Sequence, residues 1–302
     1  SRRRSRGRHQ GARQSVRGKQ RLIKPERIVA ALDDAARGDR IFHGAVIVQD
    51  SLAGLETLLA HTDAMVRAAF APHDPLRAHQ ALDPERYRDI AETLIAAFQR
   101  GGEVRTLFRD MFIEAGVDPS RVYWDKLRLR IQPPGETHMS RHLRNLPAHR
   151  DTWGSNLLAQ INWWAPLYPL TSARTLVLYP AHWQAAIANT SAAWDYEALR
   201  QAHRTGASYP LLPVASGMID RTDQWPVVIE PGALMCFSGA HLHASIPNTT
   251  DVARFNIETR TVSLDDLAAK RGAPDIDGGA PRRPLEWFTR MADGAPLSLD
   301  KC

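Results

Sequence analysis

The stretch GALMCFSGAHLHASIPNTTDVARFNIETR, residues 232–260, contains two strand patterns separated by a pair of histidines. Residues 234–237 are an apolar run that follows the turn residue Gly232, which is typical of a buried strand. Residues 254–260 alternate, so their polar and apolar side chains lie on opposite faces of a strand. The polar face carries Arg254, Asn256, Glu258 and Arg260. A polar face within a strand-rich body predicts one wall of a ligand cavity.

A second stretch, HRDTWGS at residues 149–155, supplies a candidate metal-binding motif. His149 and Asp151 are two residues apart, and on an extended backbone such residues point to the same side. His243, 94 residues further on, is the best candidate for a third ligand. Two imidazoles and one carboxylate leave coordination positions open, as in non-haem Fe(II) oxygenases. Without this context, a lone His-x-Asp pair is more commonly a surface ion pair.

Two residues compete for roles in this region. His241 lies on the same strand face as His243 and is the alternative third ligand, although the spacing to Asn248 favours His243. Arg254 can form a bidentate pair with a carboxylate, and Arg260 is its weaker alternative.

The order of patterns along the chain predicts an α+β protein. Residues 25–120 are mostly helical, with a first helix from Pro25 to about Gly38 and others at 52–70, 83–100 and 106–116. A strand pattern at 41–50 interrupts them. Short strand patterns then dominate residues 121–262. This order predicts a β-sandwich or jelly roll, cupin-like, braced by N-terminal helices.

Two further segments complete the expected organisation of a single domain over residues 25–302. Residues 183–225 are an insertion that we expect to act as a lid or specificity region, because long connections in compact domains are often functional. Residues 263–302 form a polar C-terminal extension.

The charge of the chain is unevenly distributed. The net charge is +6, yet residues 1–24 hold ten basic residues and no acid, which leaves 29 basic and 33 acidic residues in the remainder. We expect this segment to be a disordered tail, with contact to nucleic acid or anionic lipid as the alternative. No apolar run is long enough for a membrane span, and none follows the basic start as in a secretory signal. The two cysteines predict no disulfide framework, in keeping with the cytoplasm.

Four spaced features resemble the Fe(II)/2-oxoglutarate-dependent dioxygenases, in particular the phytanoyl-CoA dioxygenase-like family. They are His149-x-Asp151, Phe237 six residues before His243, the HxSxPN run from His243 to Asn248, and Arg254 eleven residues after His243. The resemblance covers roughly residues 105–262. Within it, HRDTWGSNLLAQINWW is similar to a subgroup associated with antibiotic biosynthesis, including a streptomycin-cluster protein. Ala244 stands where the family more commonly has Gly.

The resemblance implies a fold, ligands and a reaction. The fold would be a double-stranded β-helix, with Fe(II) bound by His149, Asp151 and His243. Arg254 would bind the distal carboxylate of the cosubstrate 2-oxoglutarate, and O₂ would be consumed with release of succinate and CO₂. Because related halogenases replace the carboxylate ligand, the presence of Asp151 favours hydroxylation or desaturation of a small-molecule substrate.

Two groups of residues are candidates for contacting this substrate. Lys126, Arg128 and Arg130 share a strand face and could hold an anion, or could form a solvated edge strand. Gln160, Asn162 and Trp164 share another face and either line the pocket or fill the core. Two alternative functions remain: a cupin-like metalloenzyme of another class, such as an isomerase or a Zn or Mn enzyme, and an inactive barrel used for binding.

Overall fold

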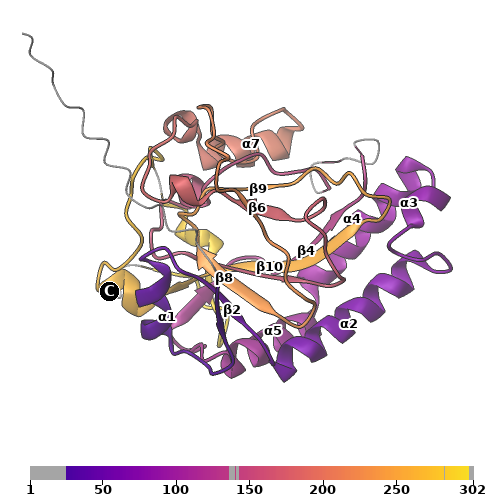
Figure 1. Ribbon diagram of the computed structural model, residues 1–302, viewed down its shortest axis with the longest axis horizontal. Helices are drawn as coiled ribbons and strands as arrows, with labels where there is room; N and C mark the ends of the chain where they lie inside the picture. Colours follow the sequence, from indigo (N-terminus) through magenta and orange to yellow (C-terminus); the bar gives the residue numbers. More distant parts are fainter. Residues whose placement is uncertain (1–24, 136–139, 141–142, 282, 299–302) are drawn as a thin grey trace, which may run out of the picture.

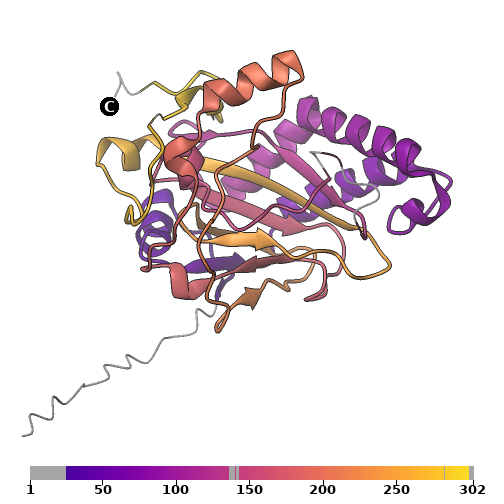
Figure 2. The same ribbon diagram turned by 90° about the horizontal axis from the view of Figure 1, so that it is seen from above.

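The computed structural model describes residues 25–298, except 136–139, 141–142 and 282, and has a mixed α/β architecture (Figure 1). The predicted basic tail, residues 1–24, lies outside the described residues. One sheet has eight strands and a second has three. Figures 1 and 2 show the N-terminal helices packed along one side of the large sheet, away from the strands of the small sheet.

The large sheet has the strand order β1-β2-β8-β5-β10-β3-β11. The eighth strand, β4, also pairs with β10: it contacts residues 254–258 of β10, and β3 contacts residues 261–263. Its strands are β1 (Glu26–Ile28), β2 (Val46–Gln49), β3 (Val122–Trp124), β4 (Arg128–Gln132), β5 (Ile161–Pro166), β8 (Leu234–Ser238), β10 (Arg254–Ser263) and β11 (Thr289–Arg290). β1 pairs with β2 in parallel, and the other pairs are antiparallel. β5 and β8 are buried along their whole length, which agrees with their largely apolar sequences.

The small sheet faces the large one across an apolar layer. It has the order β7-β6-β9, with β6 (Leu176–Leu178), β7 (Trp225–Pro226) and β9 (His243–Ser245). Buried side chains of β6 pack in one cluster with side chains of the large sheet. Members of that cluster include Val48, Trp164, Leu176, Leu178 and Met235. β9 begins with His243, so this arrangement places a predicted ligand between the sheets.

Helices cover the other face of the large sheet. The longest are α2 (Ala53–Phe70), α4 (Pro84–Arg100) and α5 (Gly102–Glu114), and their buried residues join the largest apolar cluster. The predicted start of α4 is confirmed, because the Asp83 side chain accepts a hydrogen bond from the backbone N–H of Arg86 at 2.9 Å. Phe112 of α5 packs edge-on against Trp163 of β5 at a centroid distance of 4.9 Å.

The remaining helical segments are short. They are α1 (Asp34–Ile41), α3 (Ala78–Ala81), α6 (Thr152–Ser155), α7 (Tyr196–Thr205) and α8 (Leu264–Ala268), with 3-10 turns at Pro180–His182, Ser191–Ala193 and Leu285–Trp287. Within the described ranges, no helix combines the length and apolar character that crossing a bilayer requires.

The predicted helix from Pro25 to Gly38 is wrong. Residues 26–28 form β1, because the edge of β2 offers them backbone partners. A helix begins only at Asp34, where the Asp33 side chain accepts from the backbone N–H of Ala36 at 2.7 Å. This helix runs to Ile41, so the strand expected at 41–50 is shortened to β2. The N-terminal third therefore contributes two strands to the large sheet as well as helices.

Candidate metal centre

His149 and His243 are joined through their backbones. They form an isolated antiparallel bridge, in which the N–H of His149 donates to the carbonyl oxygen of His243 at 2.9 Å and the reverse bond measures 3.0 Å. Directly opposed residues of such a pair carry side chains on the same side. Their imidazole rings accordingly lie 4.3 Å apart between centroids.

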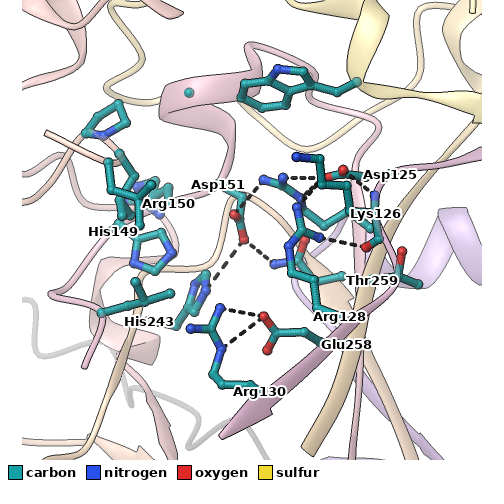
Figure 3. A pocket seen from close by; sticks show the side chains of 18 of the residues that line it. Asp125, Lys126, Arg128, Arg130, His149, Arg150, Asp151, His243, Glu258 and Thr259 are labelled. Carbon is teal, nitrogen blue, oxygen red and sulfur yellow. Dashed lines mark hydrogen bonds and ion pairs between the residues drawn. The ribbon is translucent and has the colours of Figure 1, made fainter. Parts of the chain in front are cut away.

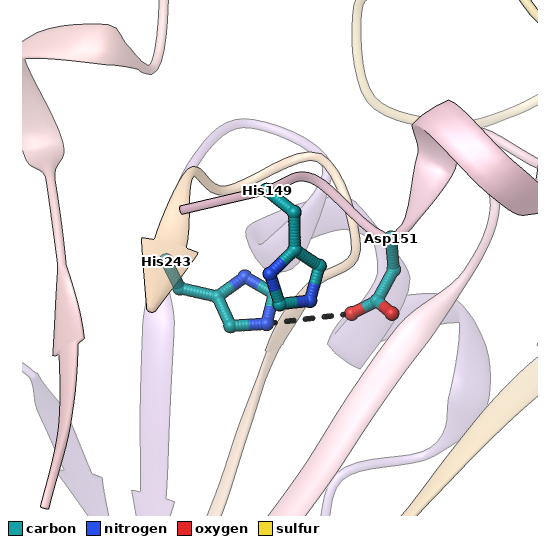
Figure 4. A group of neighbouring side chains, drawn as sticks. All are labelled: His149, Asp151 and His243. Atoms are coloured by element: carbon teal, nitrogen blue, oxygen red, sulfur yellow. Dashed lines mark ion pairs between the residues drawn. The ribbon is translucent and has the colours of Figure 1, made fainter. Parts of the chain in front are cut away.

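Asp151 completes the candidate ligand group. One ligand atom from each of His149, Asp151 and His243 lies within 4.8 Å of the others (Figure 4). The Oδ2 atom of Asp151 is 3.5 Å from the Nε2 atom of His243. The structure thus brings together the three residues that the sequence predicted as ligands.

The hydrogen bonds of the two imidazoles favour the metal-binding tautomer. The Nδ1 atom of His149 lies 2.7 Å from the carbonyl oxygen of Pro147, and the Nδ1 atom of His243 lies 3.0 Å from that of His241. A carbonyl accepts only, so each Nδ1 carries the proton when the ring is neutral. Each Nε2 then has a free lone pair, the form in which an imidazole binds a metal.

The backbone at Asp151 differs from the extended conformation predicted for His-x-Asp. Its φ of −63° and ψ of −31° are helical, because the buried turn α6 begins at the next residue. Its carboxylate is held by two donors instead. Asn162 Nδ2 lies 2.5 Å from Oδ2, and Arg260 Nη1 lies 3.1 Å from Oδ1.

The environment stabilises the protonation states that a divalent cation requires. Burial and the neighbouring His243 lower the pKa of His149 to about 4. Burial raises the pKa of Asp151, but Arg260, the two imidazoles and the hydrogen bond from Asn162 outweigh it and hold that pKa well below its usual range. At neutral pH the group therefore offers a neutral His149 and an ionised Asp151.

Arg254 is a buried cation that forms no ion pair among the described residues, and the nearby carboxylate of Glu258 offsets its charge only in part. It is the first residue of β10 and is 2 % exposed, and its Nε and Nη1 atoms form no hydrogen bond among the described residues. Burial and the nearby Arg130 lower its pKa to about 9. Burying a charge unpaired is costly, and Arg254 lines the same cavity as the three candidate ligands. A ligand carboxylate would satisfy it.

The two competing residues are occupied elsewhere. The ring of His241 stacks on Trp183 at a centroid distance of 4.3 Å, and His241 is not a member of the ligand group. Arg260 is paired with Asp125 and Asp151. Among the described residues, Arg254 has donors without a partner, whereas all three nitrogen atoms of the Arg260 guanidinium are hydrogen-bonded.

The predicted basic strand face lines the cavity, but two of its three cations already have partners (Figure 3). Arg128 Nη2 lies 2.8 Å from Asp125 Oδ2, and Arg130 Nη2 lies 2.6 Å from Glu258 Oε1. Lys126 is exposed and has no ion pair within the described part of the chain. Of the three, Lys126 is the one whose charge no described residue compensates.

The second group of predicted substrate residues divides in the same way. Asn162 and Trp164 line the cavity, whereas Gln160 lies outside its lining. The Nε2 atom of Gln160 donates to Asn162 Oδ1 at 2.9 Å, and Asn162 in turn donates to Asp151. Gln160 therefore supports the candidate metal centre rather than the substrate space.

The cavity measures about 420 Å³ and reaches from the ligand group to the predicted lid. Its lining from that region is largely apolar and includes Trp194, Tyr196, Leu199, Leu211 and Leu212. The sequence did not identify Asp125 or Trp287, which also line it. Asp125 is the one acid in VYWDKLRLRIQPPG, and an acid within a basic pattern could have identified it as a partner of the neighbouring arginines. Trp287 lies in a Gly/Pro-rich segment without a pattern that could have identified it.

Neither the protein-family models nor the curated protein sequences give a match to this chain. Solved structures do, at low identity. One is ThoJ, a non-haem monooxygenase in its apo form, with 18% identity over 75% of this chain and 76% of its own, and a TM-score of 0.41. Another is EctD from S. alaskensis with bound Fe, with 16% identity over 91% and 90%, and a TM-score of 0.42.

A third is SnoN, a non-haem α-ketoglutarate-dependent epimerase from nogalamycin biosynthesis. It shares 13% identity over 88% of this chain and 97% of its own, with a TM-score of 0.39. All three TM-scores are below 0.5.

Proposed function

We propose that this protein is a non-haem Fe(II)/2-oxoglutarate-dependent dioxygenase that hydroxylates a small molecule. His149, Asp151 and His243 would bind the iron, and Arg254 would bind the distal carboxylate of 2-oxoglutarate. The two facing sheets support a double-stranded β-helix core within one domain over residues 25–302. In that organisation residues 183–225 would be the lid.

The observation that carries this proposal is Arg254, a buried guanidinium that lines the same cavity as the ligand group and forms no ion pair among the described residues. Other metalloenzymes use two histidines and a carboxylate, but they have no need of a buried guanidinium facing the same cavity. A dicarboxylate that chelates the metal through its 2-oxo acid end presents a second carboxylate to such a cation. The donor set also fits, because two imidazoles and one carboxylate suit Fe(II) and leave positions open for the cosubstrate.

The residues of this chain would bind, orient and shield the reactants. With 2-oxoglutarate and O₂ the iron supplies the oxidation of a C–H bond, with release of succinate and CO₂. His149 and His243 present their Nε2 lone pairs, and Asp151 offsets one charge of the metal. Arg254 orients the cosubstrate by a bidentate pair. Leu199 of α7 and Trp287 form part of the wall that separates the reactants from bulk water.

The cavity also limits the substrate. A volume of about 420 Å³ suits a small molecule. The apolar lining contributed by α7 and residues 211–212 favours a substrate with an apolar part. Lys126, which has no ion pair among the described residues, favours one with an anionic group. A secondary metabolite of this type is consistent with the resemblance to the antibiotic-associated subgroup.

The proposal is tested by the cosubstrate reaction, which proceeds slowly without substrate in enzymes of this chemistry. We expect the protein supplied with Fe(II), 2-oxoglutarate and O₂ to form succinate, and the His149→Ala variant to form none above the metal-only control. Equal succinate from both proteins would contradict the assignment. Hydroxylation is then separated from epimerisation by the mass of the product, which increases by one oxygen atom only in the first case.

The alternative is a cupin-like metalloenzyme of another class. Such an enzyme would bind Zn or Mn in the same site and would be active without 2-oxoglutarate. Its reaction would give no role to Arg254, whose Nε and Nη1 atoms have no partner among the described residues.

A further inference from the structure

The two oxygens of the Asp151 carboxylate have different surroundings. Oδ2 faces the candidate metal position, since it lies 3.5 Å from the Nε2 atom of His243, and it accepts from Asn162 at 2.5 Å. Oδ1 points away and accepts from Arg260 Nη1 at 3.1 Å. The carboxylate is therefore held with one oxygen toward the imidazoles and one toward an arginine.

Arg260 is itself anchored on the side away from the metal position. Its Nε lies 2.7 Å from Oδ2 of Asp125, and its Nη2 bonds to the same oxygen. Asp125 is 7 % exposed and follows β3, so its position is determined by the large sheet (Asp125 and Asp151 are labelled in Figure 3). The Cζ atom of Arg260 lies 5.2 Å from the ring centroid of Trp287. Two carboxylates and a ring face thus restrict one guanidinium.

Charge makes this anchor necessary. A guanidinium next to a divalent cation repels it and weakens metal binding unless a negative charge compensates the guanidinium. Asp125 compensates Arg260 and also pairs with Arg128 at 2.8 Å. The four groups Asp125, Arg128, Arg260 and Asp151 together carry no net charge, so the metal meets an oriented carboxylate in a locally neutral network.

We propose that Arg260, anchored by Asp125, is a positioning residue that presents one oxygen of Asp151 to the metal. This inference rests on the proposed function, because it takes His149, Asp151 and His243 as the ligands. It assigns to Arg260 a role different from the carboxylate-binding role that the sequence left open for it. Neither Arg260 nor Asp125 belongs to the candidate ligand group.

The test measures metal affinity and needs no substrate. Co(II) is titrated into the metal-free protein without 2-oxoglutarate, followed by calorimetry and by the visible spectrum of the bound ion. Arg260→Lys keeps the charge, but a single ammonium cannot bridge both carboxylates with the geometry of a guanidinium. Asp125→Asn keeps the shape and removes the compensating charge. Each variant is expected to weaken Co(II) binding by roughly 10- to 100-fold and to change the spectrum.

Arg130→Lys is the matched control. Arg130 lines the same cavity and pairs with Glu258 at 2.6 Å, but it forms no hydrogen bond with Asp151 among the described residues. Its Co(II) affinity and spectrum should equal those of the wild type. A loss of affinity in Arg130→Lys as large as in Arg260→Lys would overturn the proposal. Replacing any arginine of the cavity wall with lysine would then weaken metal binding, whether or not that arginine bonds to Asp151.

The outcomes separate this inference from the proposed function. If the wild type binds Co(II), His149→Ala does not, and both Arg260→Lys and Asp125→Asn stay within twofold of the wild type with an unchanged spectrum, the positioning role is wrong and the metal site stands. If the wild type binds no Co(II), both proposals fail. Should Asp125→Asn not fold, Arg260→Lys alone decides, since it removes no buried charge.

Discussion

His149 and His243 exchange two backbone hydrogen bonds, at 2.9 and 3.0 Å, although 94 residues separate them in the sequence. Their side chains are therefore brought together by the backbone itself. Two donors that the backbone holds side by side lose less conformational entropy on metal binding than two residues on independent loops. This relationship makes the two histidines, rather than His241, the pair to test.

The first prediction concerns the choice between the two neighbouring histidines. His243→Ala should weaken Co(II) or Fe(II) binding by more than about 100-fold, because removing a ligand costs more than disturbing its supports. His241→Ala should retain metal binding, since its ring stacks on Trp183 away from the ligand group. Calorimetric titration of both variants provides the measurement. Loss of binding in His241→Ala with retention in His243→Ala would reverse the assignment.

A second prediction follows from the buried charge of Arg254. Replacing it with Met should raise the free energy of unfolding of the ligand-free protein by about 1–4 kcal/mol, because an apolar side chain avoids the desolvation of a cation that Glu258 compensates only in part. Urea unfolding of the ligand-free proteins checks this. Arg128→Met is the contrasting variant: Arg128 is paired with Asp125, so its removal should destabilise. A strong destabilisation by Arg254→Met would mean that Arg254 has protein partners.

The features of the fold that the sequence predicted are those with local causes. Asp83 and Pro84 mark the start of α4, and the alternation of residues 254–260 identifies β10. The motif spacing likewise selected the three residues of the ligand group.

What the sequence missed depends on partners distant in the chain. Residues 26–28 form a strand because β2, about twenty residues further on, lies beside them. Arg128 looked like a free cation, yet Asp125 and Arg260 close a network around it that spans 135 residues. No local pattern reports such pairings.

The pH dependence of stability offers a third prediction. Burial raises the pKa of Asp266 to about 6, and Arg271 opposes this only in part. Between pH 4 and 6 the unfolded chain therefore loses this proton before the folded protein does, and the contribution of Asp266 to stability decreases as the pH rises. Asp266→Asn should match the wild type below pH 4 and exceed it above pH 6, by up to about 3 kcal/mol.

Urea unfolding at pH 4 and pH 7.5 measures that difference. Asp265→Asn is the control, because Asp265 is exposed and Arg121 holds its pKa below the usual range. This control should show no gain at pH 7.5. A stabilisation by Asp266→Asn that is as large at pH 4 as at pH 7.5 would show that its cause is not the titration of this carboxyl.

A fourth prediction tests the helix that braces the large sheet. Asp83→Ala removes the side chain that accepts from Arg86 at the start of α4 and should lower the free energy of unfolding by about 1 kcal/mol. Asp89→Ala, an exposed position on the same helix, should change it by less than about 0.5 kcal/mol. Equal effects of the two substitutions would remove the capping explanation.

In the proposed enzyme, one cavity would hold Fe(II) on His149, Asp151 and His243 and 2-oxoglutarate on Arg254. The most direct measurement is an anaerobic titration of 2-oxoglutarate into the Fe(II)-loaded protein, compared with the same titration of Arg254→Met. Loss of a buried charge pair is expected to weaken binding by at least about 30-fold, with Fe(II) affinity unchanged. Equal 2-oxoglutarate affinity in the two proteins, or no binding by the wild type, would contradict the assignment.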